Sequence, residues 1–286
     1  MRIDFLKQYQ ETVENALKGY INAWSVKSTL RDACEYALLN GGKRFRPILV
    51  LLIAKSLPFQ FDATQAALAV EFFHTASLIA DDLPCMDDEE LRRQKPALHK
   101  AFGEATAILA SYSLIAAGYE LLAANGELLK QKGLSQEKAD RLIVLAMQNV
   151  SVNTGLNGAS AGQYFDIYPS HFDLAEIFET IRKKTVTLFE ISFVLGWLFG
   201  GGNPEKIDQV KNAAKHFGMA FQIADDFIDA QEDALQDRKI NTVNLLGKNE
   251  AQILLDYHLE SFTTTCENLE LNHSVLFEML EQLKAT

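Results

Sequence analysis

The stretch Glu71–Arg93, EFFHTASLIADDLPCMDDEELRR, contains the features that decide the fold and the chemistry of this chain. An almost uncharged apolar run, residues 66–80, leads into it, and such a run is typical of a helix buried on most sides. Four aspartates follow the run directly: Asp81, Asp82, Asp87 and Asp88. Carboxylates crowded at the C-terminal end of a helix repel one another and face the negative end of its dipole. A bound cation would relieve both effects.

Magnesium is the cation that this residue type favours, because Mg²⁺ is usually held by one or two carboxylates together with substrate phosphates. Pro84 disfavours helical geometry at Leu83, so we expect the chain to kink between the two aspartate pairs and let them converge. The alternative interpretation of this stretch alone is a solvated acidic helix end.

A second acidic cluster, FQIADDFID at residues 221–229, also follows an apolar run. Asp225 and Asp229 lie one helical turn apart and share a face, with Gln222 one turn before Asp225. Two such clusters, far apart in the chain, predict carboxylates that face each other across a cavity with metal ions between them.

The composition sets limits on the class of protein. The 286 residues suit one domain, residues 1–286, and 48% hydrophobic residues are enough for a sizeable core. A formal net charge of −11 argues against a general nucleic-acid surface. The three cysteines form no CxxC pattern, which fits a reduced, cytoplasmic protein. We expect no signal peptide, because the N-terminal residues 1–20 contain no apolar core. We also expect no transmembrane segment, because the apolar stretch 107–124 contains polar residues and is typical of a buried core helix.

Apolar spacing is helical nearly throughout, and no convincing strand is found. We expect a capping box at Asp62 and Gln65, a helix over 103–124 that breaks at Asn125-Gly126, and a helix capped by Ser135. Further helices are expected at about 6–17, 30–39, 47–57, 63–80, 135–153, 174–199 and 204–229. The fold class is therefore predicted to be all-α, in a single large helical bundle.

Basic residues gather at three places. Gly41–Pro47, GGKRFRP, puts three cations beside a glycine turn and a helix start, which suits a phosphate, although a solvated basic loop is the alternative. Lys183-Lys184-Thr185 interrupts an apolar helix, where a lysine needs an anionic partner. Arg92-Arg93 follows the first aspartates, and His74 lies two turns before Asp81 on the same face.

These motifs together resemble the trans-isoprenyl diphosphate synthases of the farnesyl and geranylgeranyl diphosphate type. The resemblance covers roughly residues 35 to 250 and keeps the family's order and spacing of motifs. It rests on the glycine-glycine-lysine motif Gly41–Pro47, the first aspartate motif Asp81, Asp82 and Asp87 with Arg92-Arg93, Gly162-Gln163, Lys184-Thr185, and the second aspartate motif Asp225, Asp226 and Asp229.

The resemblance implies a helical bundle around a deep central cavity, a homodimer, and Mg²⁺, three ions per active site, between the aspartate clusters and an allylic diphosphate. The implied metal ligands are Asp81, Asp87 and Asp225, with Asp82 and Asp229 as further candidates. Lys43, Arg46, His74 and Arg93 would hold isopentenyl diphosphate. Arg92 and Lys184, with Thr185 and Gln222 beside them, would hold the allylic substrate (dimethylallyl, geranyl or farnesyl diphosphate), and no nucleophilic side chain is needed.

The chain departs from the family's pattern in several places. Ala80, Ser111-Tyr112 and Val186 stand where members usually carry His, Gly-Asp and Gly. The segment after the second aspartate motif is also shortened, and Lys239 is the nearest candidate for the substrate-binding lysine expected there. These departures leave two alternatives open: a non-catalytic subunit of a heteromeric synthase, and a class I terpene cyclase, which would not need the Lys43, Arg46 and Arg93 site.

The length of the product is expected to depend on the helix before Asp81. By the resemblance, the position five residues before the first aspartate sets the floor of the pocket, and here it is Ala76, followed by Ser77. Small residues leave room for a longer tail, so we expect a product of twenty carbons, with fifteen as the second choice. Phe73 and Tyr112 are the candidates for closing the pocket, and the alternative role of Ala76 is close helix packing.

Overall fold

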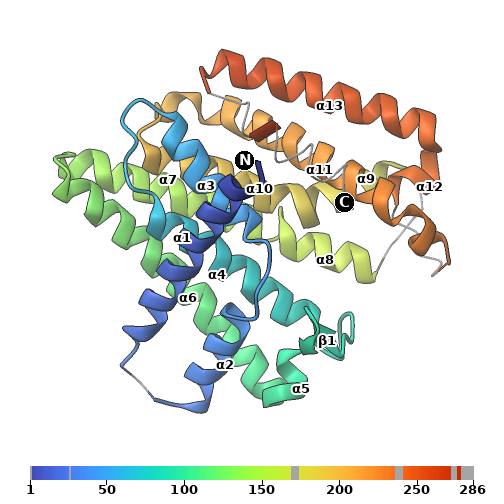
Figure 1. Ribbon diagram of the computed structural model, residues 1–286, viewed down its shortest axis with the longest axis horizontal. Coiled ribbons are helices and arrows are strands. Elements are labelled where there is room, and N and C mark those ends of the chain that lie inside the picture. Colours follow the sequence, from blue (N-terminus) through green and yellow to red (C-terminus); the bar gives the residue numbers. More distant parts are fainter. Residues whose placement is uncertain (1, 26, 169–173, 236–240, 272–275, 278–286) are drawn as a thin grey trace.

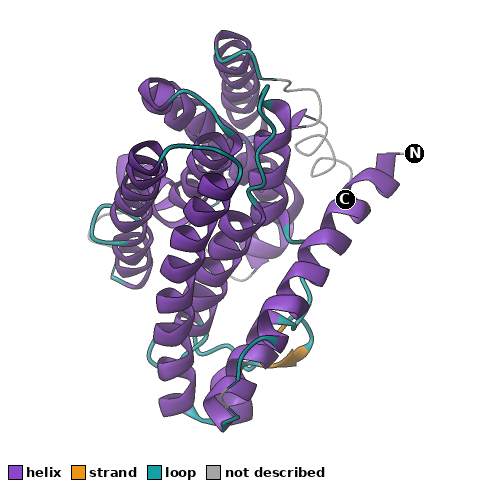
Figure 2. Cartoon of the chain, turned by 90° about the vertical axis from the view of Figure 1, so that its left-hand side faces the viewer, coloured by secondary structure: helices purple, strands orange, loops and turns teal. Residues whose placement is uncertain are grey.

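The computed structural model of the chain describes residues 2–25, 27–168, 174–235, 241–271 and 276–277. Within these residues the fold is a bundle of helices with one short β-hairpin, so the predicted all-α fold is confirmed (Figures 1 and 2). The elements in chain order are α1 Arg2–Asn22, α2 Thr29–Leu38, α3 Phe45–Ser56, α4 Thr64–Asp81, β1 Leu91–Arg92, β2 Lys95–Pro96, α5 Leu98–Phe102, α6 Glu104–Gln131, α7 Gln136–Thr154, α8 Ala159–Ile167, α9 Leu174–Ile181, the π-helical segment η1 Arg182–Val186, α10 Thr187–Gly200, the 3-10 turn η2 Pro204–Lys206, α11 Ile207–Leu235, α12 Thr242–Leu246 and α13 Lys248–Asn268.

Helices α4 and α10 form the centre of the bundle. Every residue of α10 except Glu190 is buried, and α10 packs against α3, α4, α7 and α11. A helix that is apolar all round is stable only when neighbours cover it on every side. Helix α4 is buried along most of its length and lies along α6. The main hydrophobic core extends from Val13 on α1 to Leu276.

Helix α6 runs without a break from Glu104 to Gln131, so the break expected at Asn125-Gly126 is wrong. Asn125 is fully buried, accepts a hydrogen bond from the Ala66 nitrogen at 2.9 Å, and donates to the Asp62 carbonyl at 3.0 Å. Its side chain therefore caps the start of α4 from a distant helix. The capping box expected at Asp62 is also wrong, because the N-cap residue is Ala63 and the Asp62 carboxylate accepts from the adjacent Thr64 nitrogen. The cap predicted at Ser135 is confirmed.

The helix expected over 174–199 is interrupted by η1, a π-helical segment with the sequence RKKTV. Single π-helical turns are rare and occur often at functional sites. Here the segment contains both Lys184 and Thr185. The absence of strands expected from the sequence is wrong at one place, where β1 and β2 pair as an antiparallel hairpin. Two-residue strands are too short to show an alternating pattern.

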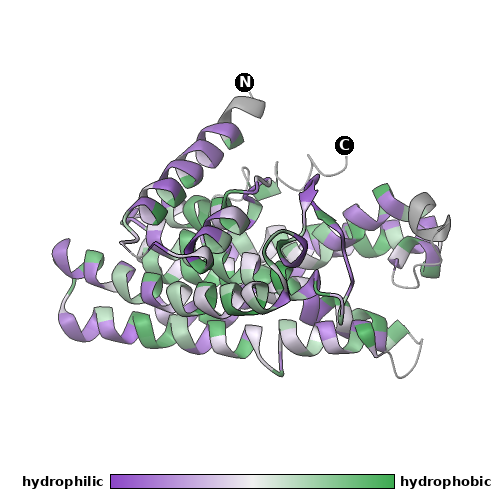
Figure 3. Cartoon of the chain, turned by 90° about the horizontal axis from the view of Figure 1, so that it is seen from below, coloured by the Kyte–Doolittle hydropathy of each residue, from purple (hydrophilic) through white to green (hydrophobic). Residues whose placement is uncertain are grey.

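Helix α6 also has an exposed apolar side. In Figure 3 the central helices are mostly hydrophobic and α1 is mostly hydrophilic. By length and composition α6 could cross a membrane: its apolar window has a mean hydropathy of 1.5, and 39% of that window is buried. This property alone is weak evidence for a span, and α6 packs along α2, α4 and α7 as a core helix does. The exposed apolar side chains on α6 are Ile108, Leu109, Tyr112 and Ile115.

Candidate active site

The loop from Gly41 to Arg46 is shaped by three positive φ angles, 80° at Gly41, 118° at Gly42 and 51° at Arg44. Left-handed geometry is costly for a residue with a Cβ, so Arg44 needs compensating contacts. Its guanidinium is fully buried and is paired with Glu71 on α4 and, at 2.6 Å, with Glu14 on α1. Arg44 therefore faces inward and ties the loop to two helices, which corrects the expectation that all three cations of this motif face a phosphate.

The other cations gather near His74. The Arg46 guanidinium lies 4.8 Å from the centre of the Phe189 ring, and its buried Nε has no hydrogen-bond partner among the described residues. Burial lowers the pKa of Arg46 to about 10; Glu71 opposes this lowering and Arg93 contributes to it. Burial and then Arg46 and Arg93 hold the pKa of His74 well below its usual value, and its Nδ1 is also buried without a partner in the described structure. Neutral His74 thus lies within a field of positive charge.

Arg93 and Lys43 complete this cation group at its exposed side. The Arg93 guanidinium donates to the Gly41 carbonyl and lies against Gly42, while burial lowers the pKa of Arg93. Lys43 is exposed, and within the described residues no carboxylate lies at ion-pairing distance from Lys43, Arg46 or Arg93. Uncompensated cations of this kind favour an anion, and a diphosphate supplies enough charge to satisfy several of them.

The first aspartate motif lies at the other end of the same face of α4. Helix α4 ends at Asp81, and the chain folds back so that the Asp87 nitrogen donates to the Asp81 carbonyl at 2.9 Å. Asp87 also accepts a hydrogen bond from Gln163 on α8 at 3.0 Å. Burial raises the pKa of Asp81 to about 6; Lys184 opposes this rise, while Asp87 and Asp82 add to it. The chain reversal expected at Pro84 is therefore observed.

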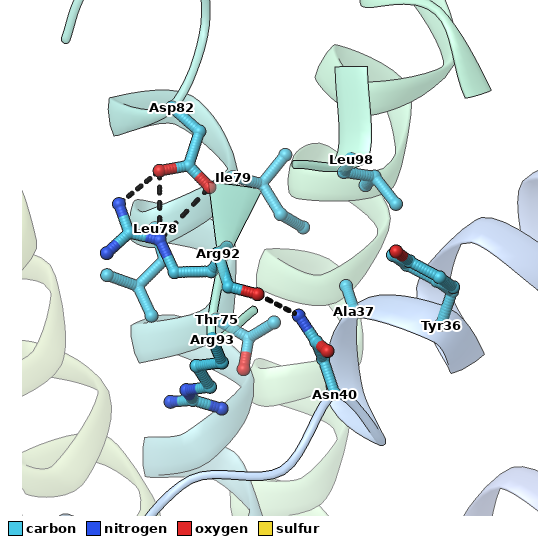
Figure 4. Close-up of a pocket in the computed structure, with 10 residues that line it drawn as sticks. All are labelled: Tyr36, Ala37, Asn40, Thr75, Leu78, Ile79, Asp82, Arg92, Arg93 and Leu98. Carbon is cyan, nitrogen blue, oxygen red and sulfur yellow. Dashed lines mark hydrogen bonds and ion pairs between the residues drawn. The ribbon is translucent and has the colours of Figure 1, made fainter. Parts of the chain in front are cut away.

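Asp82 has a different role from Asp81. It is buried, and its carboxylate forms an ion pair with Arg92, whose Nε donates at 3.0 Å (Figure 4). The Asp82 carboxylate is thus neutralised by a side chain, and we retain only Asp81 and Asp87 as ligand candidates in this motif.

The π-helical segment η1 lies directly against α8. A Cβ at Gly162 would lie 2.5 Å from the Lys184 nitrogen, so only glycine allows this approach. Lys184 forms an ion pair with Asp166 on α8, and Thr185 donates to Gln222 on α11 at 3.0 Å. Asp166 and Gln163 were not among the predicted site residues, although Gln163 belongs to the Gly162-Gln163 motif and Asp166 lies in the same helix shortly after it.

The second aspartate motif is divided like the first. Asp226 is buried, accepts hydrogen bonds from the Thr242 nitrogen at 2.8 Å and from Gln222 at 2.9 Å, and so anchors the start of α12. Asp225 is half-buried and Asp229 is exposed. Lys239 lies outside the described residues. The described residues contain no group of three or more His, Cys, Asp or Glu side chains that could hold one metal ion, so the two motifs do not form a joint ligand set on their own.

The residues expected to control product length lie on two helices. Phe73 is buried against Gly118 and meets the Tyr119 ring at 5.2 Å, and Ala76 is buried with its carbonyl accepting from Ser111 at 2.9 Å. Ser77 is half-buried and donates to the His74 carbonyl. Tyr112 is 65% exposed on the outer side of α6, so it does not close an internal pocket of its own chain, which corrects the expectation for this residue.

Comparison with known proteins identifies the family. A sequence model described as polyprenyl synthetase matches residues 27–258. The chain belongs to the polyprenyl synthetase family. Family membership confirms the resemblance predicted from the motifs and the enzyme class, a trans-prenyltransferase.

Individual relatives agree with this assignment. The chain is 31% identical to the farnesyl diphosphate synthase of Bacillus subtilis (strain 168) over 294 residues, covering 98% of this chain and 97% of the relative. It is 39% identical to the heterodimeric geranylgeranyl pyrophosphate synthase large subunit 2 of Arabidopsis thaliana over 231 residues, covering 79% of this chain and 58% of that longer protein.

Solved structures show the same fold. The geranyltransferase from Legionella pneumophila matches with a TM-score of 0.84 and 29% identity, over 100% of this chain and 97% of that one. The geranyltransferase from Helicobacter pylori 26695 matches with a TM-score of 0.80 and 31% identity, over 99% of each chain. These structural matches cover 99–100% of this chain.

Proposed function

We propose that this chain condenses isopentenyl diphosphate with an allylic diphosphate (dimethylallyl, geranyl or farnesyl) as a short-chain prenyltransferase. The observation that carries the proposal is the distribution of charge along α4. Arg46 and Arg93, which pair with no carboxylate among the described residues, are close enough to His74 to lower its pKa, and the desolvated Asp81 carboxylate lies two turns further along the helix. One helix thus separates a diphosphate-binding group from a metal-binding group.

The cation group is proposed to bind isopentenyl diphosphate. Lys43, Arg46 and Arg93 would neutralise the diphosphate, while neutral His74 can still exchange a hydrogen bond with one of its oxygens. The aromatic ring of Phe189 beneath Arg46 holds the guanidinium in a fixed orientation. This site distinguishes a synthase from a cyclase, because a cyclase has no second diphosphate to bind.

The allylic diphosphate is proposed to bind between the two aspartate motifs, near Lys184 and Arg92. Thr185 and Gln222 hold the turn of η1 that presents Lys184, and Asp82 directs Arg92. In the reaction the allylic C–O bond breaks, and its electron pair leaves with the diphosphate. The double bond of isopentenyl diphosphate then forms the new carbon–carbon bond, and a proton is lost to the released diphosphate. Lys184 and Arg92 stabilise the charge on the leaving group.

The carboxylates present fit Mg²⁺. They supply hard oxygen ligands, and burial raises the pKa of Asp81 although Lys184 and Arg92 lower it, so a bound cation would stabilise its charged form. Asp81, Asp87 and Asp225 would hold the metal, three ions by family resemblance, with Asp229 as a further ligand candidate. When bound, Mg²⁺ adds positive charge that stabilises the departing diphosphate. The absence of a three-carboxylate group among the described residues suits ions whose remaining ligands are substrate oxygens.

We propose further that residues 1–286 form one domain and that the enzyme is a homodimer in the cytoplasm. The proposed product has twenty carbons, and a product of fifteen carbons is the alternative. Apolar side chains exposed on α6 and on α7, among them Leu109, Tyr112 and Val144, give a second copy a surface to cover. Cys34, Cys85 and Cys266 are all free, which fits a reducing compartment. In analytical ultracentrifugation we expect a dimer, and we expect Leu109→Glu to give monomers.

The decisive experiment incubates the purified protein with isopentenyl diphosphate, each allylic diphosphate in turn, and Mg²⁺. Elongated diphosphates, lost on addition of a chelator, are expected. A hydrocarbon would indicate a terpene cyclase, and no product would indicate a non-catalytic subunit. Chromatography of the dephosphorylated products gives the chain length in the same assay.

A further inference from the structure

The hairpin that carries Arg92 and Arg93 contains an unusual turn. Strands β1 and β2 pair Leu91 with Pro96 and Arg92 with Lys95, which leaves Arg93 and Gln94 as a two-residue connection. Their φ angles are 55° and 64°. A two-residue turn with both φ angles positive has type I′ geometry, which favours Asn and Gly because other side chains are strained there. A strained turn at a functional site needs neighbours that hold it.

Two side chains at the end of α2 hold this hairpin, one on each strand. Asn40 Nδ2 donates to the Arg92 carbonyl at 3.0 Å, and the Tyr36 hydroxyl donates to the Pro96 carbonyl at 2.9 Å. Asn40 is buried, with 8% of its surface exposed. Both residues line a cavity of about 30 Å³ together with Asp82, Arg92 and Arg93 (Figure 4). Because the Asn40 side chain is buried, its hydrogen bond has a fixed direction and restricts the orientation of the peptide group whose carbonyl accepts it.

The peptide that Asn40 holds is the one that joins the two arginines. In Figure 4 their guanidiniums point apart, that of Arg92 toward Asp82 and that of Arg93 away from it. Arg92 is fixed a second time by the buried Asp82 carboxylate. Within the part of the chain that the structure describes, the Arg93 side chain has only a backbone carbonyl as its partner, that of Gly41, which directly follows Asn40. The orientation of Arg93 therefore depends on Asn40 more than that of Arg92 does.

We propose that Asn40, assisted by Tyr36, is a positioning residue that holds the strained arginine turn so that Arg93 faces the isopentenyl diphosphate. This role rests on the proposed function, because it names the substrate to which Arg93 is presented. Asn40 itself touches no substrate in this arrangement. Its effect is transmitted through one peptide bond to the cation group around His74.

Steady-state kinetics separates a positioning role from a merely structural one. In Asn40→Ala we expect the KM for isopentenyl diphosphate to rise about fivefold, as the loss of one hydrogen bond predicts, with kcat and the KM for the allylic substrate within about twofold. Tyr36→Phe should shift the same KM in the same direction by less, and it preserves the ring packing if Asn40→Ala fails to fold.

Asn125→Ala provides the matched control. Asn125 is also a buried asparagine that donates to a backbone carbonyl. It lies on α6 and binds the start of α4, whereas the arginine turn binds Asp82 at the opposite end of α4. We expect it to lower the melting temperature and leave both KM values unchanged. Equal changes in both KM values of Asn40→Ala, or the same KM pattern in Asn125→Ala, would overturn the proposal.

The turn itself provides a rescue experiment. Gln94→Gly removes the side chain that is strained at positive φ, so the hairpin should keep its geometry with less support. We expect Asn40→Ala/Gln94→Gly to recover most of the lost KM, and no recovery would count against the proposal.

Hydrogen exchange of residues 91–97 tests the same contact without catalysis. Exchange should be faster in Asn40→Ala than in wild type or Asn125→Ala. If the wild-type protein elongates no substrate, the proposed function falls, and unchanged exchange in Asn40→Ala separately rejects the positioning role.

Discussion

The aspartate pair at the end of α4 and the pair within α11 have the same sequence but are held by different partners. Asp82 is bound to the Arg92 side chain, whereas Asp226 is bound to the Thr242 nitrogen and the Gln222 amide. In each pair the second aspartate anchors a neighbouring segment, the arginine hairpin or the start of α12. The first aspartate, Asp81 or Asp225, is the proposed metal ligand of each pair.

Helical geometry explains this division of roles. Adjacent residues on a helix point about 100° apart, so two neighbouring carboxylates cannot both face the same cavity. A pair of aspartates therefore provides one group for ligand binding and one for structure. Among the described residues, the two regions differ in the kind of anchor, which is an ion pair with Arg92 for Asp82 and hydrogen bonds from the Thr242 nitrogen and the Gln222 amide for Asp226.

The largest effect is expected from the site-facing aspartates. Asp81→Asn and Asp225→Asn should each lower kcat/KM for condensation by roughly 10³-fold, because each removes a charge that the leaving diphosphate requires through its metal. The melting temperature of Asp81→Asn should not fall, since burial already disfavours this charge. Activity assays at saturating Mg²⁺ and circular dichroism measure both.

Asp88→Asn is the control for this experiment. Asp88 is an exposed carboxylate in the same loop, and asparagine tolerates its φ of 50°. It should keep near-wild-type turnover. An Asp81→Asn protein that is as active as Asp88→Asn would remove Asp81 from the ligand set.

A smaller effect is expected from the anchoring aspartates. Asp82→Ala and Asp226→Ala should each lower the free energy of unfolding by about 2–3 kcal/mol, because each leaves buried donors without acceptors. Asp82→Ala should also raise the KM for the allylic substrate, since Arg92 loses its anchor. Urea denaturation measures both losses. A repeat in 1 M salt should reduce the loss in Asp82→Ala, because Arg92 is partly exposed and salt screens its ion pair.

A loss in Asp82→Ala that salt leaves unchanged would show that the ion pair with Arg92 does not anchor the hairpin.

The sequence predicted the parts of the molecule that local chemistry determines. The apolar runs of α4 and α10, the reversal at Pro84 and the cations at Lys43 and Arg46 follow from residue type and spacing. The division of roles within each aspartate pair was not predicted: Asp82 was expected among the metal ligands, and its ion pair with Arg92 forms only in the folded hairpin. The extent of the domain, residues 1–286, and the identity of the Mg²⁺ ligands remain predictions.

The remaining features depend on contacts between distant residues. Asn125 caps α4 from α6, and an Asn-Gly pair in isolation predicts a turn instead. Arg44 turns inward because Glu14 and Glu71 lie there, and the π-helical turn at Lys184 depends on the close approach of Gly162. A single sequence does not show which distant residues these side chains contact, so the roles of Asn125 and Arg44 were predicted wrongly and the π-helical turn was not predicted.

The α11 region also has a titratable contact with α13. The Nδ1 atoms of His216 and His258 lie 2.9 Å apart in the interface. Burial, then His216 and Lys215, lower the pKa of His258 to about 4. Between this value and the ordinary 6.5, the unfolded chain binds a proton that the folded chain excludes. Stability is therefore complete above pH 6.5 and declines as the pH falls toward 4.

Between pH 7.5 and pH 5 this histidine should reduce the free energy of unfolding by about 2 kcal/mol. Urea denaturation at the two pH values measures this decrease in the free energy of unfolding. We expect it in the wild-type protein, and we expect most of it to be absent in His258→Gln. Hydrogen exchange at pH 5 should rise in α13 before it rises in α4. A loss of the same size in His258→Gln would place the acid sensitivity elsewhere.

The smallest change concerns the product rather than the rate. Ala76 and Ala220 each lie five residues before the first aspartate of their pair, and both are buried. Only the α4 position is expected to face the growing chain, so Ala76→Phe should shorten the main product by one five-carbon unit, and Ala220→Phe should not. Both substitutions overfill a packed interior and should lower stability by about 1–3 kcal/mol, which makes Ala220→Phe the matched control for packing strain. Chromatography of the dephosphorylated products measures the length.

Ala76 also faces α6, where Ser111 bonds to its carbonyl. If Ala76→Phe loses stability like Ala220→Phe and makes the wild-type product, Ala76 serves helix packing, and the floor of the pocket lies at another residue.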